Sequence, residues 1–328
     1  MGILALSPML KRGYQIELSV GTIAASATLG ILIPPSIMLV IMGDLLSISV
    51  GDLFLGAVFP GLILSGLYIL YIGILSYVRP SLAPLMPREE LQIPLATLAG
   101  RVLRTLLPPL FLIVMVLGSI FVGWATPTEA AGVGAFGSVL LAWFNRRLNR
   151  ETVTDVTQRT AKITAMVFMI VVGATAFSYV FRSLGGEEVI EASLLGLPFG
   201  SWGILFVLMG VVFLLGFFFD WIEITLIVLP VFGPIVGKLD FGPMFATVGD
   251  QTLWFAMLVA INLQTSFLTP PFGFALFYLK GVAPPNVQLG HLYRGIIPFV
   301  ILQLIGLAIV FLFPELVTWL PKIALGRN

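Results

Sequence analysis

Long apolar runs separated by short polar connections make up most of the chain. A helix needs about 20 mostly apolar residues to cross a bilayer, and only helices or closed barrels satisfy their backbone polar groups in lipid. The runs are too long for barrel strands, so the pattern predicts an all-α polytopic membrane protein. The expected spans are 17–42, 52–78, 102–124, 127–148, 160–183, 253–279 and 292–320.

The stretch 202–238 has a different pattern. Two apolar arms, 202–218 and 224–237, flank a charged step with Asp220 and Glu223. Each arm is short for a crossing, so we expect a re-entrant hairpin whose tip is surrounded by protein. The Asp220-x-x-Glu223 spacing fits a capping box at the start of the second arm. A carboxylate this deep costs about 2.5–3.5 kcal/mol or more and usually marks an ion or substrate path, so both interpretations stay open.

The composition excludes several classes of protein. Of 328 residues 59% are hydrophobic and only 10% charged, against about 25% charged in an ordinary soluble domain. The 17 Lys and Arg nearly balance the 16 Asp and Glu, so no basic surface for a nucleic acid is expected. With no Cys and one His, thiolate chemistry is excluded and a His-based metal site is not expected. The sequence contains no G-x-x-x-x-G-K-[ST] motif that would indicate an ATPase.

Charges in the connections predict the orientation of the spans. Lys11 and Arg12 precede the first span, and the loops 79–104 and 145–162 are rich in arginine. The positive-inside rule makes all three cytoplasmic. Acidic residues such as Asp52 lie in the intervening connections, and the alternation puts the C-terminus on the outer side.

Two segments of the chain resemble each other. Residues 27–37 and 265–273 each contain a double proline in the middle of a predicted span, and 51–60 parallels 290–298. The charge pattern makes the two copies run in opposite directions. This predicts an inverted-topology repeat with broken helices, as in many secondary transporters, with a site near the bilayer midplane. The predicted domains are 1–100, the C-terminal part of the first repeat, and 101–328, the second repeat.

The proline pairs give this prediction a chemical basis. A proline has no N–H and displaces the carbonyl four residues earlier. The first pair should therefore free the carbonyls of Gly30 and Ile31, and the second pair those of Ser266 and Phe267. Carbonyls freed in hydrocarbon cost several kcal/mol unless they are satisfied, and a sodium ion takes oxygen ligands. The alternative is that each pair is a structural kink satisfied by neighbouring hydroxyls.

Polar residues at the two breaks and at the hairpin complete the predicted site. Any one membrane hydroxyl is more often bonded to its own helix, so the prediction depends on the group. Three residues are candidate sodium ligands: Gly30, Ser266 and Asp220. The predicted ion- and substrate-binding residues are Ser26, Thr28, Gly30, Pro34, Pro35, Asp220, Thr225, Thr265, Ser266, Thr269, Pro270 and Pro271.

Several motifs together resemble a known family, the DctM-type large membrane subunit of the TRAP transporters. The two double prolines and the Thr-Pro-Thr-Glu-Ala sequence are its most specific features. The stretches that carry the resemblance are Met9–Tyr14, Gly21–Ile37, Leu53–Leu62, Ala125–Ala135, Phe217–Val236 and Leu268–Pro284.

The resemblance implies a sodium-coupled importer of organic acids, such as C4-dicarboxylates or related carboxylates, in the bacterial inner membrane. Its partners would be a small membrane subunit (DctQ type) and a periplasmic solute-binding protein (DctP type) that delivers the substrate. The implied fold is similar to the ion-transporter superfamily, with an elevator-like movement, Na⁺ as coupling ion, no other cofactor and a periplasmic C-terminus. Family members carry further N-terminal spans, so we expect a chain short by on the order of a hundred residues, with half of the ion site absent.

Two other functions stay open at this point. The expected shortening keeps a non-transporting scaffold subunit open as an alternative. An intramembrane acid–base enzyme could use Asp220 and Glu223, but the sequence has no H-E-x-x-H motif and no second membrane aspartate in a similar setting. We therefore expect a transporter subunit rather than an enzyme.

Overall fold

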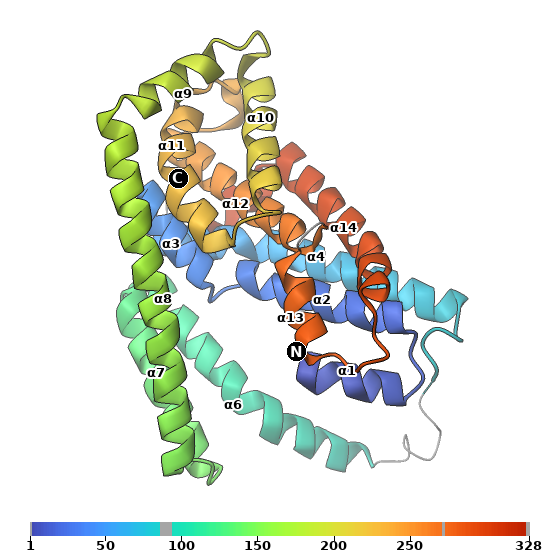
Figure 1. Ribbon diagram of the computed structural model, residues 1–328. Coiled ribbons are helices and arrows are strands. Elements are labelled where there is room, and N and C mark those ends of the chain that lie inside the picture. The colour runs from blue at the N-terminus through green and yellow to red at the C-terminus, as the bar shows by residue number, and fades with distance from the viewer. Residues whose placement is uncertain (1, 86–93, 271–272, 326–328) are drawn as a thin grey trace. The chain divides into compact units, whose positions relative to one another are not determined.

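The computed structural model is all-helical and describes residues 2–85, 94–270 and 273–325 (Figure 1). Within this part of the chain, six helical segments are long and apolar enough to cross a membrane, which supports a polytopic membrane protein. The expected spans 127–148 and 253–279 are not among these six, whereas Trp221–Lys238, expected as one arm of a hairpin, is. The chain divides by its internal contacts into two compact units. Unit 1 is Met1–Leu85 with Ala174–Asn328, and unit 2 is Met86–Gly173. Contact units are a different property from sequence repeats, so the repeat boundaries stay a prediction.

Unit 1 contains the double prolines and the predicted hairpin. Its helices are α1 (Gly2–Lys11), α2 (Ile16–Leu32), α3 (Ile37–Leu46), α4 (Val50–Val78), the end of α8 (Arg150–Ser183), α9 (Gly186–Leu195), α10 (Gly200–Leu215), α11 (Trp221–Lys238), the 3-10 turn η1 (Gly242–Met244), α12 (Val248–Leu268), α13 (Phe274–Val282), α14 (Leu289–Leu312) and α15 (Glu315–Ala324).

Two predicted spans are interrupted where the prolines occur. The span expected at 17–42 is divided into α2 and α3, with Pro34 and Pro35 between them. The span expected at 253–279 is divided into α12 and α13. A proline cannot donate to the helical ladder, which explains why each helix ends just before its pair.

The two largest boundary differences from the sequence prediction concern α14 and α8. The span expected at 292–320 ends at Leu312, and a separate helix, α15, follows Pro314. The span expected at 160–183 belongs to a longer helix that begins at Arg150. Proline accounts for the first difference, because it ends the ladder of α14. The second arises because a polar extension continues the helix beyond the apolar window.

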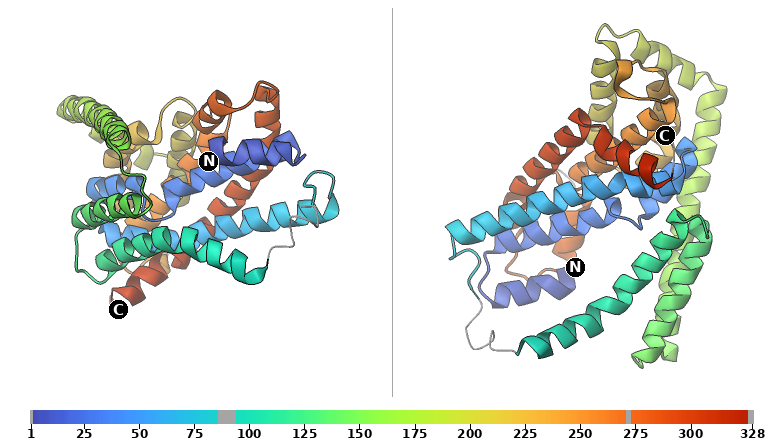
Figure 2. Two further views of the ribbon diagram at one scale, coloured as in Figure 1. Left: turned by 90° about the horizontal axis from the view of Figure 1, so that it is seen from below. Right: turned by 180° about the vertical axis from the view of Figure 1, so that it is seen from behind.

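Helix α12 forms the core of unit 1. Every residue from Leu253 to Leu268 is buried, and α2, α4, α10, α11, α14 and α15 all pack against α12 (Figures 1 and 2). Near the N-terminal end of α12, the indole N–H of Trp254 donates to the carbonyl of Val310 at 2.9 Å, so this buried donor is satisfied.

Helices α2 and α14 touch through their backbones. A Cβ atom on Gly21 would lie 2.1 Å from the carbonyl oxygen of Gly295, and one on Gly295 would lie 2.3 Å from that of Glu17. Small residues allow this close approach, which is a common way to pack helices in membranes.

The contacts also group the helix ends of unit 1. The segment after α3 and the segment before α12 line one hollow, where Lys322 of α15 pairs with Asp250 at 3.1 Å. The end of α3 therefore lies beside the start of α12. Elsewhere in unit 1, Gly2 of α1 lies against Leu279 and Val282 of α13.

Unit 2 contains α6 (Leu95–Phe121), α7 (Pro127–Phe144) and the first part of α8, and α6 packs against α7 (Figure 2). A capping box begins α7: the hydroxyl of Thr126 accepts from the N–H of Glu129, whose carboxylate accepts from the N–H of Thr126. None of the residues of α6 is buried, so its apolar surface suits lipid or another membrane protein.

We predict that Gly295→Ala lowers the free energy of unfolding by about 1–3 kcal/mol, because the new methyl group would meet the backbone of α2. Thermal unfolding in detergent measures this. Gly290→Ala, on the same helix, is the matched control, since a Cβ atom at Gly290 would have no neighbour within 4 Å. Equal unfolding temperatures for the two variants would contradict the close contact between α2 and α14.

Candidate functional site

The break between α2 and α3 is partly satisfied by a serine. The hydroxyl of Ser36 donates to the carbonyl of Ile31 and accepts from the N–H of Leu39 at 3.5 Å, which caps α3. One of the two carbonyls that we expected to be free therefore has a hydroxyl partner, as the structural-kink alternative proposed. The carbonyl of Gly30 cannot receive the usual helical bond, because the residue four positions later is Pro34.

The break after α12 is rich in side-chain oxygens. Thr265 donates to Ile261 O at 3.0 Å, Ser266 to Leu263 O at 2.8 Å and Thr269 to Thr265 O at 2.8 Å. A hydroxyl that donates to its own helix still has lone pairs for a cation. The carbonyl of Ser266 accepts the N–H of Thr269 at 3.1 Å and keeps a second lone pair.

The hairpin arms α10 and α11 meet at a turn that ends in a capping box. The side chain of Asp220 accepts from the N–H of Trp221 at 2.6 Å, and the N–H of Asp220 donates to Glu223 at 2.7 Å. The predicted capping box is confirmed. Among the residues that the structure describes, the hydrogen bonds of Asp220 stay within its own helix start, so its charge is not neutralised there by a basic side chain.

The start of this turn lies directly against the break of α12. A Cβ atom on Gly216 would lie 2.0 Å from Ser266 Oγ and 2.5 Å from Ser266 Cβ. Only glycine fits at this distance. Further along the arm, the side-chain amide of Asn262 donates to Met209 O at 2.7 Å and holds α10 against α12.

The two breaks are joined by a buried side chain. Gln264 donates from Nε2 to the carbonyl of Thr28 at 2.5 Å. Gln303 of α14 donates to the hydroxyl of the same threonine at 3.4 Å. Thr28 therefore connects α2 to both α12 and α14 in the middle of unit 1.

A cavity of about 400 Å³ lies beside the break of α2. Three predicted site residues, Ser26, Thr28 and Gly30, line it together with Tyr278 of α13 and Phe267 of α12. The rest of the lining is mostly apolar. A cavity of this size, with a few polar groups beside helix carbonyls, suits a small molecule.

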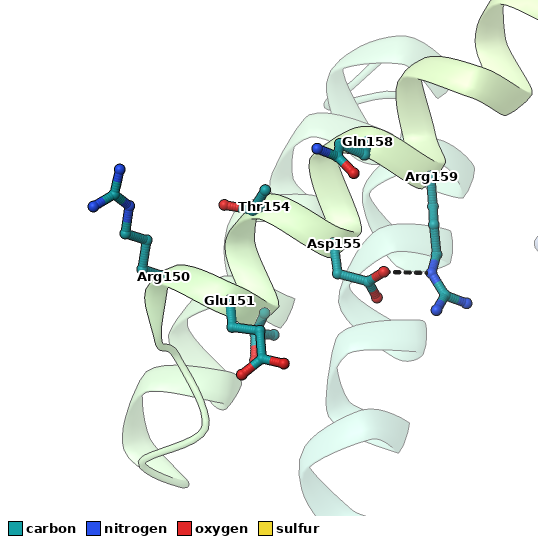
Figure 3. A pocket seen from close by; sticks show the side chains of 7 residues that line it. Arg150, Glu151, Thr154, Asp155, Gln158 and Arg159 are labelled. Carbon is teal, nitrogen blue, oxygen red and sulfur yellow. Dashed lines mark hydrogen bonds and ion pairs between the residues drawn. The ribbon is translucent and has the colours of Figure 1, made fainter.

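A larger hollow near the start of α8 has no such character. Its lining residues all lie in the first turns of one exposed helix, and their side chains point outward (Figure 3). Asp155 forms an ion pair with Arg159 at 2.8 Å. An exposed helix face of this kind does not enclose a ligand.

The structure brings some of the predicted residues close to one another. Residues of the α2 break line the cavity, Ser266 lies against the hairpin, and Thr265 and Thr269 are one helical turn apart. Thr225 is fully buried on α11, and its hydroxyl has no hydrogen-bond partner among the described residues. Pro270 follows α12, while Pro271 lies outside the described residues. No group of three or more His, Cys, Asp or Glu that could hold a metal ion is found in the described part of the chain.

Sequence reasoning missed Gly216 and Gln303. The second had a signal, since Gln303 is the one polar side chain in the apolar run 295–313. Gly216 had none, because its closeness to Ser266 depends on how the hairpin packs.

Comparison with known proteins gives a family match over most of the chain. Residues 1–316 match the model of the tripartite ATP-independent periplasmic transporter, DctM component. A C4-dicarboxylate TRAP transporter large permease protein of Pseudomonas aeruginosa is 32% identical, over 98% of this chain and 71% of the relative. An isethionate TRAP transporter permease protein of Oleidesulfovibrio alaskensis, DctMQ, is 30% identical, over 96% and 47%. A sialic acid TRAP transporter large permease protein of Vibrio cholerae is 28% identical, over 99% and 72%.

We predict that Gly216→Ala destabilises the protein by about 1–3 kcal/mol, because its methyl group would overlap the side chain of Ser266. Adding Ser266→Gly removes the overlapping atoms, so the double variant should be more stable than the sum of the two single effects. Thermal unfolding of the four proteins measures the coupling. Strict additivity would mean that the hairpin does not touch α12 here. Gly210→Ala, with open space around it on the same helix, is the control.

Proposed function

Because the chain belongs to the DctM component family of tripartite ATP-independent periplasmic transporters, we propose that it carries the path for sodium-coupled import of a small organic acid. The family consists of transporter permeases, so the chain is a large permease subunit and the acid–base enzyme alternative is removed. The observation that carries the proposal is that the last turns of α12 contact both α2, through Gln264 and Thr28, and the turn of the hairpin, through Ser266 and Gly216.

An inverted repeat is the architecture that we propose for this region. Aligning the proline pairs equates each residue of α2 with the residue 236 positions later, so Glu17 corresponds to Leu253, and the downstream motif equates Gly56 with Gly295. Gly295 packs against Glu17, and a Cβ on Gly56 would lie 3.5 Å from Leu253 Cδ1. The same pair of equivalent positions thus makes contact twice, which supports two copies related by a two-fold axis.

Cation binding at the breaks follows from the oxygens that they collect. The carbonyl of Gly30 lacks its helical donor, and the carbonyl of Ser266 has a lone pair to spare. Sodium is a hard cation, and in a dry site such oxygens replace its water shell, as carbonyl rings do in ion filters. We propose that Asp220 contributes charge or shapes the hairpin turn, with the re-entrant hairpin closing over the breaks.

The substrate class is proposed from the relatives and from the cavity. Three relatives are named for a C4-dicarboxylate, isethionate and sialic acid, and each of these carries an acidic group. The cavity lining contains no Lys or Arg. An anion would therefore be held by hydroxyls, helix N-termini and the bound cations. We propose a small carboxylate, the group that a C4-dicarboxylate and sialic acid share, whereas isethionate is a sulfonate.

The partners and location follow from membership of a tripartite system. We propose a DctQ-type small membrane subunit and a DctP-type periplasmic binding protein that delivers the substrate, and one relative carries the DctMQ name that joins two components. The inner membrane is the proposed location, with the C-terminus periplasmic. This orientation is supported by the basic loops, which the positive-inside rule assigns to the cytoplasm.

Reconstituted uptake tests the function. Proteoliposomes that contain the large and small subunits should accumulate a labelled C4-dicarboxylate when the binding protein and an inward sodium gradient are supplied. Omitting the binding protein or replacing sodium with potassium should abolish accumulation. Uptake driven equally well by a proton gradient without sodium would contradict sodium coupling. No uptake of any acid by the complete system would contradict the transporter proposal itself.

We predict that Asp220→Asn raises the sodium concentration for half-maximal uptake by roughly tenfold or more, because asparagine still caps α11 but removes the charge. Sodium titration of uptake measures it. Glu129→Gln is the control, since it removes a carboxylate from the other capping box, at the start of α7. If both variants keep the sodium dependence of the unaltered protein, Asp220 has no part in binding the cation.

A further inference from the structure

Two glutamine side chains from different helices meet at Thr28. Gln264 on α12 and Gln303 on α14 are both 0% exposed. Gln264 Nε2 donates to the backbone carbonyl of Thr28 at 2.5 Å, and Gln303 Nε2 donates to its hydroxyl at 3.4 Å. Burying a side-chain amide inside a membrane protein costs free energy unless the amide forms hydrogen bonds, and such residues often have a functional role.

The bond from Gln264 joins equivalent positions of the two proposed repeats. The alignment that equates Pro34 with Pro270 also equates Thr28 with Gln264 and Gly30 with Ser266. The donor and the acceptor each lie two residues before the proposed cation ligand of their own repeat. The link therefore crosses the axis between the repeats and ties one break to the other.

We propose that Gln264 is a positioning residue that couples the two helix breaks, so that a cation bound at one break orders the other. This inference rests on the proposed function. A cation that draws the carbonyls of one break together also fixes α12 against α2 through this hydrogen bond. The second break is then already in position, and binding there loses less conformational entropy.

Gln264 suits this role better than Gln303. Its hydrogen bond is shorter, it ends on the backbone of α2, and it starts on the helix that itself breaks. Gln303 belongs to α14, which has no break near this contact. Gln264 Oε1 has no hydrogen-bond partner among the described residues, so replacing the amide removes one donor bond and no acceptor bond.

The test is a sodium titration of uptake by the complete reconstituted transporter with Gln264→Met, which keeps the side-chain length without the donor. We expect the Hill coefficient for sodium to fall toward one. We expect the half-saturating sodium concentration to rise roughly two- to tenfold, as for the loss of one buried hydrogen bond. The maximal rate of uptake should change by a smaller factor than the half-saturating sodium concentration.

Gln251→Met is the matched control. Gln251 is a buried glutamine on the same helix, and its amide donates to Val236 O at 2.5 Å and Leu239 O at 2.9 Å, far along α12 from the break. We expect it to affect stability without changing the Hill coefficient or the half-saturating sodium concentration. Equal sodium responses in the two variants, or no change with Gln264→Met, would overturn the coupling.

A second measurement covers the case of poor folding of the methionine variant. Gln264→Asn keeps a buried amide but is one methylene too short to reach Thr28. Its sodium-induced rise in unfolding temperature, measured in detergent against potassium, should be smaller than that of the unaltered protein, because at a fixed ligand concentration the stabilisation falls as the dissociation constant rises. An undiminished rise would overturn the inference alone. An unaltered protein without any sodium response in stability or uptake would overturn the proposed function, and this inference with it.

Discussion

The loss of backbone hydrogen bonds at the proline pairs is the constraint on which unit 1 depends. In hydrocarbon, a carbonyl without a donor must find another partner, and lipid supplies none. Ser36 supplies one for Ile31, and the N–H of Thr269 supplies one for Ser266. The carbonyl of Gly30 is left beside a cavity that ligands can enter. A break of this kind is stable only where its polar groups find partners, and the helix α12 that ends at the second break is buried along its length from Leu253 to Leu268.

Burial of α12 makes close contacts between neighbouring helices necessary. Neighbouring helices pack closely around a helix that is buried on all sides. Glycine has no side chain and so leaves room for the side chain of Ser266 at Gly216 and for that of Leu253 at Gly56. Polar cross-links then select one arrangement among the many that apolar packing alone allows. Asn262 holds the hairpin arm, and Gln264 holds the other broken helix. Packing and hydrogen bonding therefore act together on the same helix.

The proposed mechanism needs this part of the molecule to be stiff in some places and adjustable in others. Helix ends around the prolines have few fixed backbone bonds, so a cation can order them. The buried amide of Gln264 is fixed between two helices and transmits that order. In the proposed inverted repeat, equivalent positions meet, so the same physical change would occur at both breaks, which suits a transporter that alternates between two states.

The sequence by itself determined the class of protein and the two places where helices are interrupted. Hydrophobic run length, loop charge and proline chemistry are local properties, and the capping boxes at Thr126 and Asp220 were predictable for the same reason. Helix ends were less predictable, as the separation of α15 from α14 at Pro314 illustrates. Only the tertiary structure decided that Gln264 reaches Thr28 across 236 positions and that Gly216 meets Ser266. Such contacts depend on how complete helices pack, and no local pattern of residues records that packing.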